Sequence, residues 1–97
     1  MSRTRNTRHT DYVDGVVRFR CPAGHRVPGF VVLHPGRMIL SREVIVSDAR
    51  KFRLRCDNCA AEGRHLDLQV SRARVEAAAA ENMLDVTRPY TLLDIGG

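Results

Sequence analysis

The sequence predicts a small α+β domain, in which antiparallel strands come first and are followed by one C-terminal helix and a short tail. Between residues 15 and 70, apolar side chains alternate with polar ones in short runs, which is typical of half-buried strands. Over residues 71–87 the composition becomes alanine-rich, and apolar residues recur at helical spacing. The 97 residues have the length of one domain, with residues 1–14 as a flexible basic arm and residues 88–97 as the tail.

Turn residues divide the β region into its strands. Asp14-Gly15 precedes the first strand, and Pro35-Gly36 ends the second. The predicted strands cover residues 16–20, 27–34, 50–55 and 66–70. Two short apolar runs, 38–40 and 44–46, are most simply one more hairpin or a long strand with a bulge.

The helix is expected to begin after Ser71, whose hydroxyl can cap the first turn. Its apolar stripe contains Val75, Ala79, Met83 and Val86, and Arg88-Pro89 prevents further helical turns. Residues 90–95 then form a short apolar tail.

Three cysteines and one histidine fall in two clusters, one from Cys21 to His25 and the other from Cys56 to Cys59. Each cluster begins at the cysteine that ends an Arg-apolar-Arg-Cys tetrad. Because alternate side chains of a strand share a face, Cys21 and Cys56 should both lie on the apolar side of their strands. Two tight turns can then direct two donors each at one tetrahedral metal ion.

This pattern resembles the zinc-ribbon group of folds over residues 16–70. The resemblance implies a zinc ion bound by Cys21, Cys56, Cys59 and a histidine, with His25 preferred to His34 or His65. The first pair is C-x3-H rather than C-x2-C, and 30 residues (26–55) separate the two pairs, so an extra hairpin should lie inside the ribbon.

Two other interpretations of the cysteines stay open. Cys56 and Cys59 also match a redox C-x-x-C motif, which is expected where a strand meets a helix, whereas residues 60–70 look like a turn and a strand. Cys21 could instead be a small buried hydrophobic residue, with His25 on a surface turn.

Charge is unevenly distributed along the chain. Residues 1–74 contain 15 Lys/Arg and 7 Asp/Glu, and all basic residues except Lys51 are arginine. An arginine-rich face is typical of phosphate binding, although GC-rich bacterial and phage genomes produce the same bias. The residues expected to contact nucleic acid are Arg18, Arg20, Arg53 and Arg55 on the strands, and Arg3, Arg5 and Arg8 on the arm. Aromatic residues are not interleaved with these arginines, so the contact should be mainly electrostatic.

Catalysis is not expected, because the chain lacks the common nucleophile, phosphate-loop and metalloprotease motifs. The sequence therefore predicts a non-catalytic, zinc-stabilised module that binds nucleic acid or is associated with transcription. The alternative is a protein-interaction or assembly component, for example a phage structural or host-modulating protein. It would use the helix over 75–86 and the tail between Tyr90 and Ile95. The sequence has no apolar run long enough to span a membrane, so we expect the protein to lie in the cytoplasm or within a virion. The arginine bias suggests a bacterial or phage protein.

Overall fold

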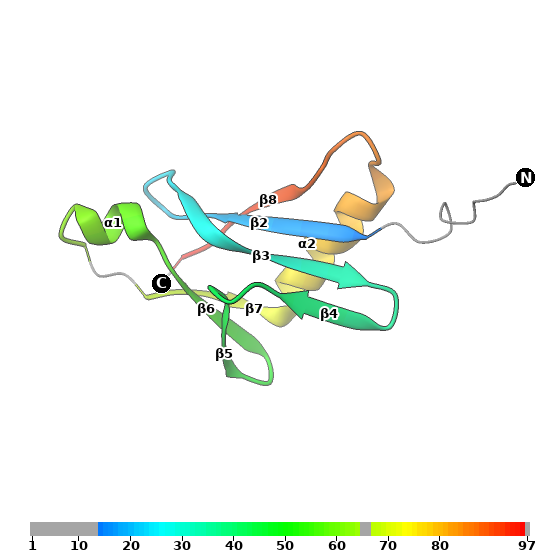
Figure 1. Ribbon diagram of the computed structural model, residues 1–97, viewed down its shortest axis with the longest axis horizontal. Helices are drawn as coiled ribbons and strands as arrows, with labels where there is room; N and C mark the ends of the chain where they lie inside the picture. Colours follow the sequence, from blue (N-terminus) through cyan, green and yellow to red (C-terminus); the bar gives the residue numbers. More distant parts are fainter. Residues whose placement is uncertain (1–13, 65–66, 97) are drawn as a thin grey trace, which may run out of the picture.

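The computed structural model describes residues 14–64 and 67–96, which form two sheets and two helices (Figure 1). The four-stranded sheet has the order β4-β3-β2-β8, and the three-stranded sheet has the order β5-β6-β7. The strands are β2 (Gly15–Arg20), β3 (Arg26–His34), β4 (Arg37–Leu40), β5 (Ile45–Asp48), β6 (Lys51–Arg55), β7 (Asp67–Ser71) and β8 (Thr91–Asp94). The helices are α1 (Asp57–Ala61) and α2 (Arg72–Leu84). All strand pairs are antiparallel except β2 with β8. The predicted α+β class is confirmed.

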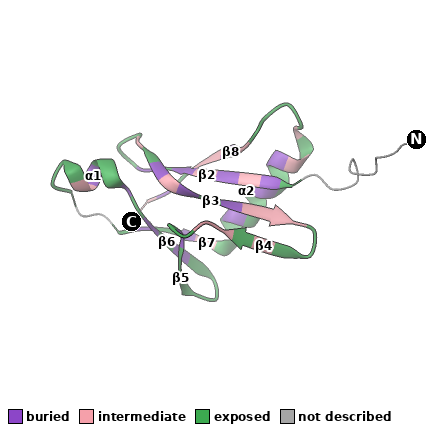
Figure 2. Cartoon of the chain, viewed as in Figure 1, coloured by how far each residue is buried: buried purple, intermediate pink, exposed green. Residues whose placement is uncertain are grey.

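The alternation expected of the two tetrads is confirmed by burial (Figure 2). Phe19 and Cys21 on one tetrad, and Leu54 and Cys56 on the other, are at most 3% exposed. Both sheets therefore turn their apolar faces into one core, and the arginines between these residues point away from it.

The two apolar runs around residues 41–43 do not pair with each other, so the predicted hairpin or single long strand is wrong. β4 pairs with β3 in one sheet, and β5 pairs with β6 in the other. The chain crosses between the sheets beside Gly29, which has a φ of +121°. A Cβ there would lie 3.1 Å from the Cβ of Glu43 and 3.3 Å from Leu54, so this close crossing requires glycine.

Helix α2 begins where the sequence predicts it. The hydroxyl of Ser71 accepts a hydrogen bond from the backbone N–H of Arg74 at 3.2 Å, and Val75 and Ala79 are fully buried. The helix crosses the inner face of β2 at Gly15, where a Cβ would lie 2.3 Å from the carbonyl oxygen of Ala79. It ends at Leu84, before Val86, which is 77% exposed, so Val86 does not belong to the buried stripe.

A buried polar residue, Asn82, belongs to the buried stripe of α2, whereas the predicted Val86 does not. Its Oδ1 accepts a hydrogen bond from the backbone N–H of Val16 at 2.8 Å, and its Nδ2 donates to the carbonyl of Arg88 at 3.0 Å. This side chain fixes the end of α2 to the start of β2.

The C-terminal tail packs on the chain's own core. β8 adds to the four-stranded sheet, and the backbone N–H of Ile95 donates to the carbonyl of Arg20 at 3.0 Å. One residue further, the carbonyl of Gly96 accepts from the N–H of Gln69 on β7 at 2.7 Å. The tail therefore links the two sheets, and Ile95 is only 4% exposed.

Candidate metal centre

The first pair of candidate ligands lies in the loop between β2 and β3. The backbone N–H of Cys21 donates to the carbonyl of His25, and the N–H of Gly24 donates to the carbonyl of Cys21, both at 2.9 Å. Gly24 has a φ of +89°, a conformation that glycine adopts without strain. The N–H of His25 also points at the Cys21 sulfur from 3.3 Å, so the turn itself brings both side chains to one side.

The second pair lies at the junction of β6 with α1. Cys56 is the N-cap of the helix, and the N–H of Ala60 donates to its carbonyl at 3.0 Å. Helix α1 was not expected, so the C-x-x-C does stand where a strand meets a helix. That argument against a redox pair is therefore wrong. The position of the other two candidate ligands is what favours a metal site.

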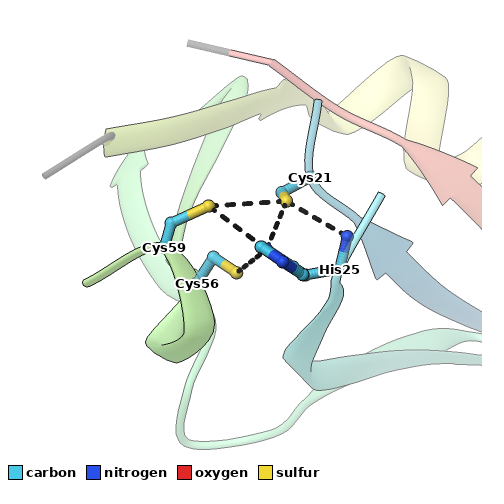
Figure 3. A group of neighbouring side chains, drawn as sticks. All are labelled: Cys21, His25, Cys56 and Cys59. Atoms are coloured by element: carbon cyan, nitrogen blue, oxygen red, sulfur yellow. Dashed lines mark hydrogen bonds between the residues drawn. The ribbon is translucent and has the colours of Figure 1, made fainter. Parts of the chain in front are cut away.

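Four donor atoms meet between these two turns (Figure 3). They are the sulfurs of Cys21, Cys56 and Cys59 and the Nδ1 of His25, and all lie within 4.8 Å of one another. The imidazole Nδ1 is 3.6 Å from Cys21, 3.9 Å from Cys56 and 3.5 Å from Cys59. The sulfurs of Cys21 and Cys59 are 3.6 Å apart, and all three cysteines, which lie in the described part of the chain, are free thiols. The group could hold a metal ion.

The crowded thiols influence one another's ionisation. Burial raises the pKa of Cys21, but hydrogen bonds from the His25 and Ala23 backbone and from the other two thiols outweigh it and lower this pKa to about 7. Burial, together with the neighbouring thiols, raises the pKa of Cys59 to about 12. Without a metal, these contacts favour one thiolate that accepts hydrogen bonds from protonated neighbours.

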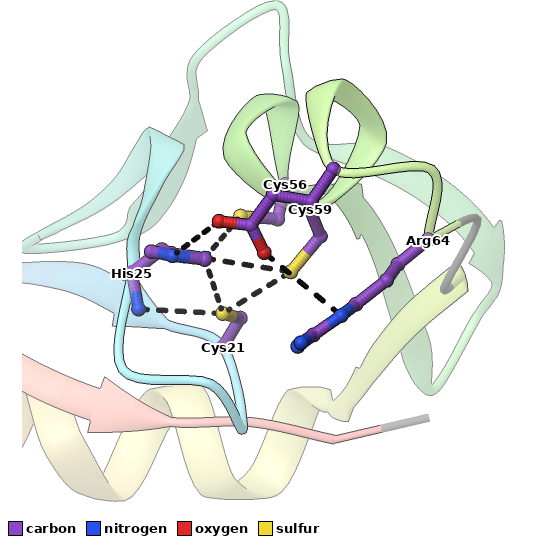
Figure 4. Close-up of polar contacts among 6 residues, drawn as sticks. Cys21, His25, Cys56, Cys59 and Arg64 are labelled. Carbon is purple, nitrogen blue, oxygen red and sulfur yellow. Dashed lines mark hydrogen bonds and ion pairs between the residues drawn. The ribbon is translucent and has the colours of Figure 1, made fainter.

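The carboxylate of Glu62 contacts the outer ring nitrogen of His25 and was not expected from the sequence. Figure 4 shows Arg64 beside the four candidate ligands. The Oε2 of Glu62 is 3.4 Å from the Nε2 of His25, and its Oε1 is 3.9 Å from the guanidinium of Arg64. A carboxylate near the far ring nitrogen favours the tautomer in which Nδ1 has a free lone pair. Glu62 is the C-cap of α1, three residues after Cys59. Its position beside His25 could not be predicted from the sequence, because α1 was not expected.

Of the other two candidate histidines, His34 lies away from the cysteines and His65 is not described by the structure. His34 lies at the far end of β3, where its Nδ1 is 2.6 Å from the Asp14 carboxylate, so it is not a ligand of this group. His65 lies outside the described residues, as do Arg3, Arg5 and Arg8 of the predicted arm.

The four strand arginines are divided between the two sheets. Arg18 and Arg20 lie on β2, whereas Arg53 and Arg55 lie on β6, so they do not form one continuous face. Arg20 donates two hydrogen bonds to the Asp94 carboxylate, at 2.6 and 3.1 Å. These bonds lower the pKa of Asp94 and keep the ion pair charged.

No family model, curated protein or solved structure matches this chain. Within the described part of the chain, no helix is both long and apolar enough to cross a membrane.

Proposed function

We propose that this chain is a non-catalytic module that is stabilised by one zinc ion and binds nucleic acid. The observation that carries the proposal is the convergence of three cysteine sulfurs and one imidazole nitrogen at the edge of the core. Such a donor set is closed, because four protein ligands leave no position for a substrate or a reactive water.

The donor spacing fits zinc. With Zn–S bonds of about 2.3 Å and Zn–N bonds of about 2.0–2.1 Å, a tetrahedron separates two sulfurs by about 3.8 Å and sulfur from nitrogen by about 3.6 Å. The Cys21–Cys59 distance is 3.6 Å, and the three sulfur–nitrogen distances are 3.5–3.9 Å. Thiolate-rich sites with one imidazole also suit zinc better than magnesium or calcium.

A structural role follows from where the ligands come from. Cys21 and His25 lie in the loop that joins β2 and β3 of the four-stranded sheet. Cys56 and Cys59 lie at the junction of β6, in the three-stranded sheet, with α1, so one ion would join the two halves of the fold. When bound, zinc supplies folding free energy of the order of 10–16 kcal/mol in small peptides, which matters in a domain of this size.

Charge supports nucleic acid as the partner. The chain has a net charge of +5, and Arg53 and Arg55 are exposed on the outer face of β6. Among the described residues, no carboxylate lies within 4 Å of either guanidinium. Arginines without a carboxylate partner can bind phosphate oxygens without first breaking an ion pair.

Exposed apolar residues support the alternative, a protein-assembly component. Leu84, the last residue of α2, is 89% exposed, and Val86, two residues beyond the helix, is 77% exposed. Such residues can anchor a protein partner at the end of this helix.

Titration with labelled nucleic acid at several salt concentrations distinguishes the two. A nucleic-acid binder should lose affinity steeply as salt rises, and Arg53→Gln with Arg55→Gln should reduce the slope of log affinity against log salt. Leu84→Ser with Val86→Ser, the matched control, should leave binding unchanged. No salt-sensitive binding of wild-type protein to single-stranded or duplex nucleic acid at low salt would overturn the nucleic-acid proposal.

A further inference from the structure

We propose that the outer face of the four-stranded sheet, which we call the open face, binds single-stranded nucleic acid. The proposal rests on nucleic-acid binding as proposed above, and it assigns that binding to one surface and one class of strand. The residues that carry it are Arg18, Arg26, Phe30, Ile39 and Tyr90.

The strand register places these side chains together. Val17 and Phe19 face the core, where α2 covers β2, so Arg18 between them points to the opposite side of the sheet. Arg18 pairs with Phe30 on β3 and with Leu92 on β8. Helix α2 packs on the side of β2 that carries Gly15 and Val17, which is opposite the open face.

Tyr90 holds two arginines on the open face. The guanidinium carbon of Arg26 is 5.1 Å from the ring centroid and that of Arg18 is 5.8 Å, and Arg26 also donates to the Tyr90 hydroxyl at 2.9 Å. Stacking on a ring orders a guanidinium without neutralising its charge, unlike the Asp94 carboxylate that neutralises Arg20. Arg18 and Arg26 therefore remain able to bind phosphate.

Exposed apolar side chains lie beside these charges. Phe30 and Ile39 are each 39% exposed, and Phe30 is the neighbour of Arg18 across the strand pair. An exposed aromatic ring beside ordered arginines is the combination that stacks a base while the phosphates meet the cations. The aromatic residues are not interleaved with the arginines in the sequence, but the fold brings Tyr90 and Phe30 beside Arg18, although Tyr90 is 72 residues from Arg18 along the chain.

The ligand class follows from the ring. A base can stack on Phe30 only if it is not already stacked within a duplex, so an unpaired strand suits this face better than double-stranded nucleic acid. Hydrogen bonds with its own backbone and with Ser41 lower the pKa of Glu43, and the charges of Arg42 and Arg18 add to this effect.

Fluorescence anisotropy with an oligothymidine strand and with a duplex of equal length tests the assignment. Phe30→Leu keeps an apolar side chain but removes the ring, and it should weaken single-strand binding by about tenfold while leaving duplex binding unchanged. Arg18→Gln with Arg26→Gln should weaken single-strand binding and reduce its salt slope. Leu84→Ser with Val86→Ser, which changes two exposed residues outside the open face, is the control and should leave single-strand binding unchanged. Circular dichroism and metal content confirm that each variant is folded.

The other outcomes separate this inference from the proposed function. Wild-type binding that Phe30→Leu leaves intact, but that the Arg53 and Arg55 variant lowers, would overturn the open-face assignment and keep nucleic-acid binding. An equal loss for single strand and duplex in Phe30→Leu would also overturn it. Wild-type protein that binds neither strand nor duplex would overturn both, and the open face would then be left as a protein-docking surface.

Discussion

The Nε2 of His25 lies 3.4 Å from a carboxylate oxygen of Glu62, on the side of the ring opposite the Nδ1 that faces the three cysteine sulfurs. The histidine therefore has contacts on both sides, with the three cysteine sulfurs and with a carboxylate at the end of α1. A carboxylate close to the outer N–H makes the inner nitrogen a better ligand.

The first prediction concerns this contact. Glu62→Ala should weaken zinc affinity by about tenfold. This is the lower end of the effect of a residue that contacts a metal ligand, because the His25–Glu62 pair is partly exposed to water. Glu62→Gln should give an affinity between those of Glu62→Ala and wild type, since its amide oxygen can still lie near the outer N–H but carries no full charge. Competition with a chromophoric chelator measures this, with Glu81→Ala on the exposed side of α2 as control. An affinity equal to wild type in Glu62→Ala would show that the contact does not orient the ligand.

The second prediction ranks the ligands themselves. Cys56→Ser should lose more zinc affinity than His25→Ala, because a lost thiolate removes charge as well as a donor, whereas water can replace an imidazole. Both losses of zinc affinity should exceed the loss of about 10- to 100-fold that is expected when a residue contacting a ligand, such as Glu62, is changed. Cobalt substitution reports coordination by its visible absorption. If His25→Ala binds metal as tightly as wild type, then His25 is not the fourth ligand.

The third prediction concerns pH. The pKa of Cys21 is about 7 and that of Cys59 is about 12 in the metal-free protein, and both thiols must be deprotonated to bind zinc. Protons compete with the metal, so affinity should rise with pH. Below about pH 7 both thiols must release a proton, and above about pH 8 only Cys59 of these two does, so the rise should become shallower. Zinc affinity that is flat from about pH 6 to pH 8 would contradict this account.

The fourth prediction concerns the contact of α2 with β2. Gly15→Ala places a Cβ 2.3 Å from the Ala79 carbonyl oxygen, so the helix must shift. We expect a loss of about 1–3 kcal/mol in the free energy of unfolding, measured by urea denaturation with zinc present. Gly96→Ala, where a Cβ meets nothing within 4 Å, is the control. Equal stability of the two variants would show that the helix does not pack this closely.

The grouping of the four candidate ligands could be predicted because it depends on local rules. The alternation of Phe19 with Cys21, and of Leu54 with Cys56, is set by the pleat of each strand, and the two turns are short. The start of α2 at Ser71 is equally local, because one hydroxyl caps the helix.

The remaining features depend on pairing between distant segments. Asp94 meets Arg20 across 74 residues because β8 lies parallel to β2, and a four-residue strand gives no sequence signal for its neighbour. The same pairing brings Tyr90 to Arg18. The crossing at Gly29 depends on how the two sheets pack, so the run at 44–46 could not be assigned to the second sheet from its own residues.

The most direct test of the zinc centre is metal analysis combined with thermal unfolding of the same purified protein. We predict about one zinc per chain, and a chelator in excess should abolish the cooperative thermal transition, which added zinc should restore. Metal-free protein that melts cooperatively at the temperature of the untreated protein would contradict a structural metal centre at Cys21, His25, Cys56 and Cys59.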